Sequence, residues 1–183
     1  MEILNTPLKV KLILRVISIL LILTVPLDSF ARQLTSKHKY TAKFVYNIMS
    51  HVDFKHNIDG KINICIIGDN AMTPHLTRIV KNKNANSYAI LHRYIDDNLN
   101  NCDVLYIDEN FKEDESRALL KTKSSNALTI GNIRGFANRG GIIEFNLRKN
   151  KVELKINLSQ INSNKFIIND SLLSVSDTVN NSE

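Results

Sequence analysis

The sequence predicts an α/β fold, a single domain in which a mostly parallel sheet with crossover helices is joined by an antiparallel β-hairpin. Apolar runs rich in β-branched residues alternate with amphipathic segments over residues 39–130, which is the order of a parallel sheet. Apolar and polar residues then alternate over residues 142–158, which indicates a hairpin. The chain has 183 residues, enough for one domain with a core of its own.

The first 31 residues predict a signal peptide. Basic residues precede an apolar run from Val16 to Val25, and Pro26 ends it because proline lacks an N–H. Ser29 and Ala31 are small residues at the positions that signal peptidase reads. We therefore expect cleavage after Ala31, a mature domain over residues 32–183 and a periplasmic location. An uncleaved membrane anchor is the alternative.

The first half of the mature chain predicts two helices among its strands. Residues 32–38 are polar and are expected to fray, whereas Lys39–Val52 places its apolar residues on one helical face. Ile62–Ile67 is a buried strand between glycines, and a helix capped by Asn70 or Thr73 follows it to about Lys81. Three further runs predict strands: Tyr88–Tyr94, Asp103–Ile107 and Ala127–Ile130.

The second half predicts a helix over Lys112–Lys121 and a helical turn over Phe136–Arg139, directly before Gly140-Gly141. Ile142–Leu147 and Val152–Leu158 form the hairpin, with Lys149-Asn150 at its turn because asparagine tolerates positive φ. The C-terminal part predicts a short helix, a strand or turn, and a last helix around Leu172 and Leu173. The final residues are polar and are expected to be loose.

The composition argues against several classes of function. The formal charge of +6 is scattered without a basic stripe, so we expect no nucleic-acid binding. The histidines and cysteines lack metal-ligand spacing, and no nucleophile motif such as G-x-S-x-G occurs. Gly68-Asp69-Asn70 follows a strand but lacks the nucleotide-binding glycine motifs. We therefore expect no catalytic residues, no metal and no cofactor.

The two cysteines are Cys65, inside an apolar run, and Cys102, at the start of another. In an oxidising compartment an even count predicts one disulfide, and neighbouring parallel strands would bring the Cα atoms within about 7 Å. Two buried free thiols are the alternative.

Several segments together resemble the YfiR family of periplasmic proteins. They occur in the order of that family over residues 40–178: TAKFVYNIMSHVDF, INICIIGDN, CDVLYID, LTIGN, FANRGGIIEFNLRKNKVELKINL and DSLLSVSD. The Gly-Gly hairpin followed by Lys155-Ile156-Asn157 is the most specific of them. Phe54-Lys55 stands where the family usually has Trp-Pro, and the C-terminal helix is rich in serine.

The resemblance implies a periplasmic regulator that binds the periplasmic sensor domain of an inner-membrane diguanylate cyclase and restrains it, tuned by redox state or envelope stress. It implies no enzyme activity, and it maps a disulfide of the family onto Cys65 and Cys102. A homodimer is compatible with this role. The alternative is a small-ligand-binding accessory protein of an envelope signalling system.

Five residues are candidates for exposed positions that contact a partner, because aromatic residues and arginine are enriched at binding hot spots. They are Val52, Phe54, Phe136, Arg139 and Phe145. Burial in the core is the alternative for most of them. Arg139-Gly140-Gly141 could also form an anion-binding turn, although such glycines more often only permit a tight bend.

Overall fold

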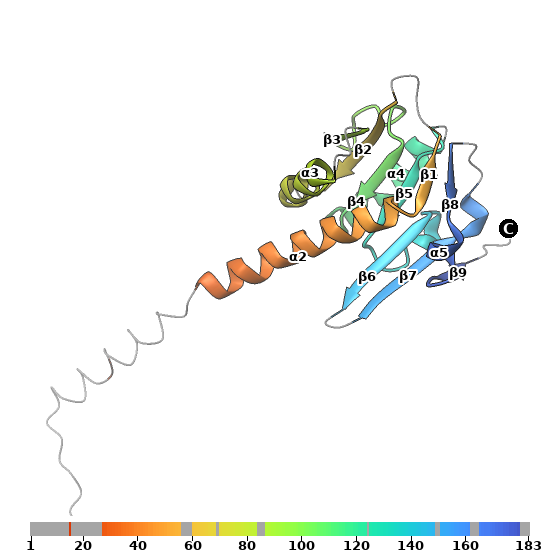
Figure 1. The fold of residues 1–183 in the computed structure, drawn as a ribbon. Coiled ribbons are helices and arrows are strands. Elements are labelled where there is room, and N and C mark those ends of the chain that lie inside the picture. Colours follow the sequence, from red (N-terminus) through yellow and green to blue (C-terminus); the bar gives the residue numbers. More distant parts are fainter. Residues whose placement is uncertain are drawn as a thin grey trace, which may run out of the picture. The chain divides into compact units, whose positions relative to one another are not determined.

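The computed structural model describes residues 15, 27–55, 60–68, 70–83, 87–123, 125–148, 151–161 and 165–179. The chain divides into two compact units, Met1–Ser36 and Lys37–Glu183. The second unit confirms the predicted α/β class, because it holds a seven-stranded, mostly parallel sheet with helices and a separate two-stranded antiparallel sheet (Figure 1).

The helices and strands have the following bounds. The helices are α2 (Leu27–Met49), α3 (Thr73–Asn82), α4 (Glu115–Thr122) and α5 (Asp170–Leu173), with 3-10 turns η1 (Asn70–Met72), η2 (Glu109–Asp114), η3 (Ala137–Arg139) and η4 (Leu158–Gln160). The strands are β1 (Val52–Phe54), β2 (Ile62–Ile67), β3 (Tyr88–His92), β4 (Val104–Ile107), β5 (Leu128–Gly131), β6 (Ile143–Arg148), β7 (Lys151–Asn157), β8 (Phe166–Ile168) and β9 (Asp177–Val179).

The large sheet has the strand order β3-β2-β4-β5-β6-β7-β9. The first five strands in that order are parallel, β7 returns antiparallel to β6, and β9 lies parallel to β7. The strands β4 and β5 are buried along their whole length. Burial on both faces is the reason that these strands read as continuous apolar runs rather than as alternating patterns.

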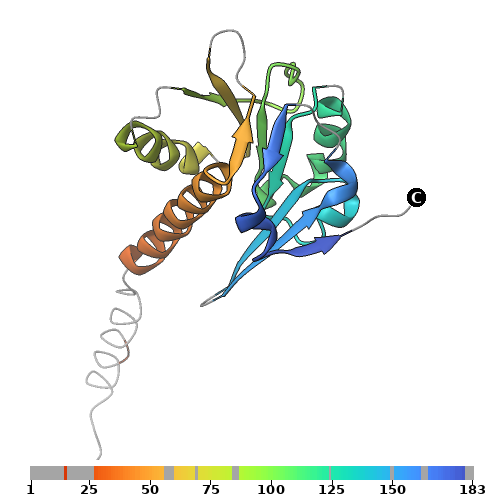
Figure 2. The same cartoon turned by 45° about the vertical axis from the view of Figure 1, so that its right-hand side comes forward.

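The two faces of the sheet carry separate apolar cores. One core joins alternate strand residues to α2, α3 and the small sheet, and α2 contributes Ala42, Val45, Ile48 and Met49. The other core lies beneath α4 and contains Cys65, Cys102, Ala118 and Phe136. The side of the sheet that carries α3 and the side that carries α4 are best seen in Figure 2. This two-sided covering is the expected consequence of right-handed crossover connections in a parallel sheet.

The structure differs from the sequence prediction at several boundaries. Residues 32–38 are helical rather than frayed, because α2 begins at Leu27 and meets no proline or glycine before Met49. The helix predicted over Lys112–Lys121 is split into η2 and α4. The prediction also missed β1 and β9, and the predicted hairpin turn at Lys149-Asn150 lies outside the described residues.

None of the described helices combines the length and the apolar character that crossing a bilayer requires.

Candidate functional site

Residues 132–142, here called the Gly-Gly loop, connect the parallel strands β5 and β6 and are built around one buried ring. The Phe136 side chain is fully buried between two glycines. A Cβ atom at Gly141 would lie 2.1 Å from Cε1 of Phe136, and one at Gly131 would lie 2.8 Å from Cγ. Gly140 is needed for another reason, because its φ of 103° is left-handed while the space around it is open. The paired glycines therefore serve two distinct requirements.

A buried carboxylate on β6 fixes the backbone of this loop. Glu144 is 1% exposed, and its two carboxylate oxygens accept hydrogen bonds from the backbone N–H groups of Gly135 (3.0 Å) and Ala137 (3.1 Å). The side chain of Asn157 donates to the carbonyl of Ala137 at 2.6 Å. The two bonds to the Glu144 carboxylate are charge-assisted and therefore stronger than neutral ones, so they stabilise this conformation of the loop.

A second carboxylate orients the side chain of Arg139. Glu115, the first residue of α4, accepts from Nε of Arg139 at 2.9 Å and from Nη2 at 2.8 Å, and Nη2 also donates to the carbonyl of Arg134. The carboxylate is 2% exposed and the Arg139 side chain 42%. The hydrogen bonds to Glu115 raise the pKa of Arg139, with the charges of Glu115 and Glu144 adding to them and burial opposing them. Nη1 of Arg139 makes no hydrogen bond with any described residue.

A hollow of about 650 Å³ lies beside the Gly-Gly loop. Its walls come from α4 and the residue after it, from the approach to β5, from the end of η3 and from η4. Apolar side chains include Leu119, Leu120, Ala127 and Ile142. Leu120 is 73% exposed, which is high for a leucine beside other apolar side chains.

Among the described residues, the charged side chains that line the hollow are the cations Lys123 and Arg139, and no carboxylate lines it. The side chains of Ser116, Lys123 and Gln160 make no hydrogen bond within the part of the chain that the structure describes. Exposed donors and apolar groups therefore stand together, an arrangement that suits a ligand carrying both negative charge and apolar surface.

Cys65 and Cys102 form a disulfide in the structure, with their Cα atoms 5.7 Å apart. Both residues are fully buried, in the same apolar cluster as Phe136. The cross-link therefore belongs to the core against which the Gly-Gly loop packs.

The burial of three predicted contact residues corrects the expectation that they are exposed. Val52, Phe136 and Phe145 are buried, and the ring of Phe145 lies 5.0 Å from that of Phe44. Their apolar side chains gain more from the core than from the surface. Phe54 is half-buried against Phe166, and Arg139 reaches solvent beside the hollow. Leu120 was missed, because a leucine in a helical pattern reads as core.

The carboxyl ends of β2 and β4, where doubly wound sheets bind ligands, are closely packed. A Cβ atom at Gly68 would lie 2.5 Å from Cβ of Asp108, so glycine permits this close approach. The buried carboxylate of Asp108 accepts from the Tyr106 hydroxyl at 3.0 Å and from the backbone N–H of Asn110 at 3.1 Å. This carboxylate is therefore engaged within the protein, while Asp69 lies outside the described residues.

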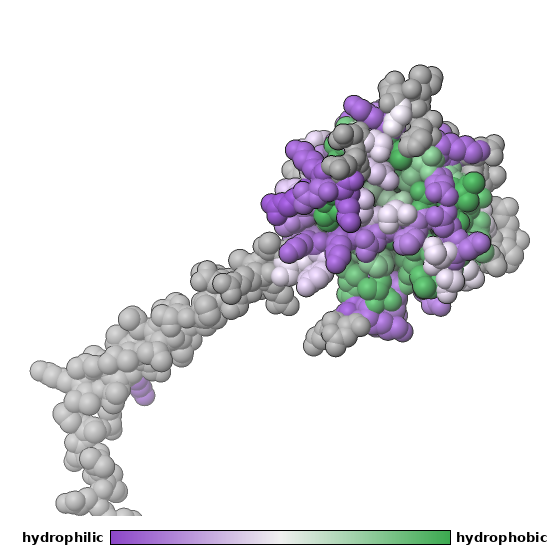
Figure 3. Space-filling model, in the orientation of Figure 1, coloured by the Kyte–Doolittle hydropathy of each residue, from purple (hydrophilic) through white to green (hydrophobic). Residues whose placement is uncertain are grey.

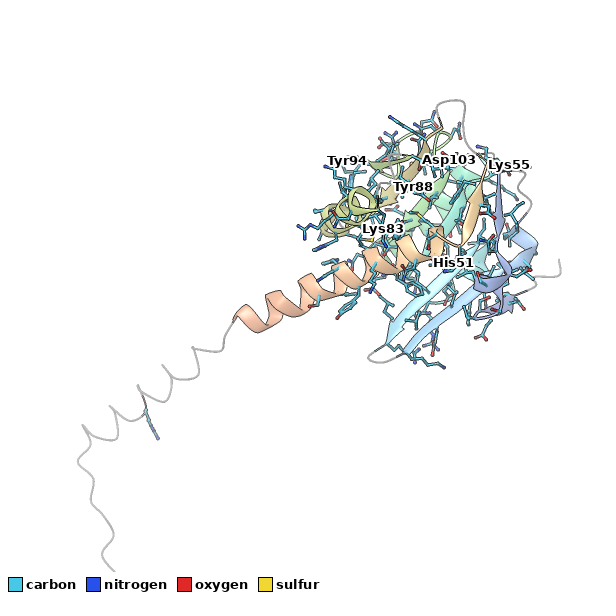
Figure 4. The ribbon with its side chains drawn as sticks, viewed as in Figure 1. His51, Lys55, Lys83, Tyr88, Tyr94 and Asp103 are labelled. Atoms are coloured by element: carbon cyan, nitrogen blue, oxygen red, sulfur yellow. A yellow bond between two sulfur atoms is a disulfide. The ribbon has the colours of Figure 1, made fainter. Side chains whose placement is uncertain are left out.

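The remaining surface has an apolar area over the hairpin of β6 and β7, which is green in Figure 3. Leu147 and Val152 are cross-strand partners there and are 39% and 44% exposed. His51, at the end of α2, lies 3.1 Å from the Ser171 hydroxyl through Nδ1 (Figure 4). None of these four residues lines the hollow, so neither feature belongs to it.

Tyr88, which is labelled in Figure 4, lies on β3, an edge strand of the large sheet. Burial raises the pKa of its hydroxyl above the ordinary value of 10.0, and Tyr46 adds to the shift. The hydroxyl is therefore neutral at physiological pH.

Comparisons with known proteins identify a family and a similar fold among solved structures. A family model described as YfiR/HmsC-like matches residues 38–177. The crystal structure of a conserved domain protein from Vibrio cholerae O1 biovar El Tor is similar, with a TM-score of 0.52 at 11% sequence identity. The alignment covers 77% of this chain and 59% of that chain. Because the identity is only 11%, the likeness concerns the fold alone. The search among curated proteins found no match.

Proposed function

Because this chain belongs to the YfiR/HmsC-like family, we propose that it binds the periplasmic sensor domain of an inner-membrane diguanylate cyclase and restrains the enzyme. The family is one of periplasmic regulators rather than catalysts. Binding of this protein would lower the production of cyclic-di-GMP inside the cell. Residues 1–31 would direct its export, and the mature domain would begin at Arg32.

The observation that carries the proposal is the family match over residues 38–177, which spans both cysteine-bearing segments and the whole Gly-Gly loop. A disulfide between buried cysteines also agrees with work in an oxidising compartment. Restraint requires that the protein binds the inactive state of the cyclase more tightly than the active state, because a ligand shifts an equilibrium only by its differential affinity.

The test compares cyclic-di-GMP in cells that contain, lack or regain the gene. We expect its loss to raise cyclic-di-GMP and the full-length chain to restore the original level. A variant that lacks residues 1–31 is the matched control, since it should accumulate without crossing the membrane and should restore nothing. Unchanged cyclic-di-GMP in the deletion strain, with no cyclase recovered on the purified protein, would contradict the proposal.

The hollow supports a second candidate function, that of a small-ligand-binding accessory protein. Its volume of about 650 Å³ falls within the range of about 300–1,000 Å³ that is typical of small-molecule sites. A ligand that binds only the folded state raises the melting temperature by mass action. A screen of envelope metabolites that leaves the melting temperature unchanged would count against this candidate.

A further inference from the structure

We propose that the hollow beside the Gly-Gly loop binds a segment of the partner protein that carries Asp or Glu next to an apolar residue. This inference rests on the proposed function and names the surface and the chemistry of the contact.

The apolar part of the argument is the exposure of Leu120. Its side chain stands on α4 and is 73% exposed, beside the less exposed Leu119, Ala127 and Ile142. Burial of such a side chain against a partner is favourable, because it removes apolar surface from water. An exposed leucine at the rim favours a protein segment over a small molecule, because a small ligand is usually enclosed by its site.

The electrostatic part of the argument is the sign of the lining charges. Lys123 and Arg139 come from different elements and both line the hollow, whereas no Asp or Glu within the described ranges does. Glu115, the nearest carboxylate to Arg139, is almost fully buried and already accepts two hydrogen bonds from that guanidinium. Complementary charge on the partner is therefore negative.

The fixed geometry of Arg139 favours tight binding. The hydrogen bonds to Glu115 and to the carbonyl of Arg134 hold the guanidinium in place before any partner arrives. Nη1 remains without an acceptor among the described residues and can donate to a carboxylate. A side chain that is already ordered loses little entropy on binding, so the contact is preorganised.

The first test places a photo-crosslinking amino acid at position 120 of the full chain in its native envelope, and identifies the attached peptide by mass spectrometry. We expect a cyclase peptide in which Asp or Glu lies within a few residues of an apolar side chain. The same amino acid at Val175, which is exposed and does not line the hollow, is the control and should give no such product. A basic peptide, or no product at position 120 in cells where the protein restrains the cyclase, would overturn the inference.

The second test measures binding of the purified protein to the sensor domain. Leu120→Asp and Lys123→Glu should each weaken binding by about tenfold or more, because they place like charge against the partner. Val175→Asp and Lys39→Glu are matched exposed controls and should stay within about twofold. Melting temperatures should be unchanged, since all four side chains are exposed.

The outcomes separate the inference from the proposed function. If the wild-type protein restrains the cyclase and the hollow variants bind the sensor domain equally well, the inference is overturned but the proposed function is not. The same holds if a small metabolite fills the hollow and leaves sensor binding unchanged. A wild-type protein that neither binds nor restrains any cyclase overturns both.

Discussion

Glu115 and Arg139 are unequal partners, and their burial determines which loss costs more. Arg139→Met leaves a buried carboxylate without a partner, whereas Glu115→Gln leaves a guanidinium that already reaches water. We expect the first change to lower the free energy of unfolding by about 3 kcal/mol and the second by about 1 kcal/mol, after allowance for solvent screening. Urea denaturation of both variants measures the difference. An equal or reversed cost would show that the pair does not act through the buried carboxylate.

Tyr88 should make stability depend on pH in the alkaline range. Burial raises its pKa in the folded state above 10.0, so the folded protein holds the proton more tightly than the unfolded chain. This contribution is complete below the unfolded pKa and is lost as the pH rises through the folded pKa. We expect Tyr88→Phe to reduce the fall in the free energy of unfolding between about pH 9 and about pH 11.

Tyr94→Phe is the control for that experiment, because Tyr94 is exposed. The two variants should differ in slope against pH rather than only in absolute stability. Identical slopes for Tyr88→Phe and the wild type would contradict the role of burial.

The sequence alone could not predict the residues whose role depends on which groups the fold brings next to them. The cysteines carry their own chemistry, so their pairing could be anticipated from an even count in a chain that is expected to be exported. Phe136 and Phe145 gave no such signal, because an aromatic residue suits an interface and a core equally. Glu144 was not singled out either, since its function depends on two backbone N–H groups that only the folded loop brings to it.

At the scale of elements, the two glycines of the Gly-Gly loop can be tested separately. Gly141 leaves space for the ring of Phe136, and Gly140 adopts a positive φ. Gly141→Ala should cost about 2–3 kcal/mol of unfolding free energy, because its methyl group would overlap the ring of Phe136. Gly140→Ala should cost about 1 kcal/mol through backbone strain alone. Denaturant unfolding of both variants in a Phe136→Leu background tests the mechanism. With the smaller side chain at position 136, the cost of Gly141→Ala should fall and the cost of Gly140→Ala should stay the same. An unchanged cost of Gly141→Ala would refute the steric explanation.

The disulfide joins β2 to the segment before β4 across 37 residues of sequence. In the chain-entropy description, closing a loop of this length stabilises by about 3–4 kcal/mol, so Cys65→Ala with Cys102→Ala should lower the free energy of unfolding by that amount. Thiol titration of the oxidised, denatured wild type should find no free thiol. Two reactive thiols would contradict the pairing.

Element prediction succeeded where a run was long or strictly patterned. Ile62–Ile67 was an apolar run bounded by glycines and the hairpin strands alternated, and the bounds of all three agree with the structure to within a residue or two. The strands β1, β8 and β9 have three residues each and show no period that a sequence can reveal. Their positions follow from pairing with distant segments rather than from local preference.

At the scale of the whole molecule, the alternation of strands and helices was enough for the fold class but not for the candidate site. The hollow draws Leu120 from α4, Arg139 from η3 and Gln160 from η4. No local spacing links these residues, because only the strand order β4-β5-β6-β7 brings their elements together. A sequence pattern can therefore predict single candidate residues, whereas a surface formed by residues from several distant elements is visible only in the structure.

The pairing of β1 with β8 means that the chain cannot complete its fold before its C-terminal residues are available. Val52 lies opposite Ile168, and β9 completes the large sheet with some of the last described residues. A chain that is synthesised from its amino terminus therefore presents an unmatched strand β1 until the residues of β8 arrive. During that interval its open edges are targets for chaperones and proteases. A chain that stops before Phe166 therefore leaves β1 without its partner strand and the large sheet without β9.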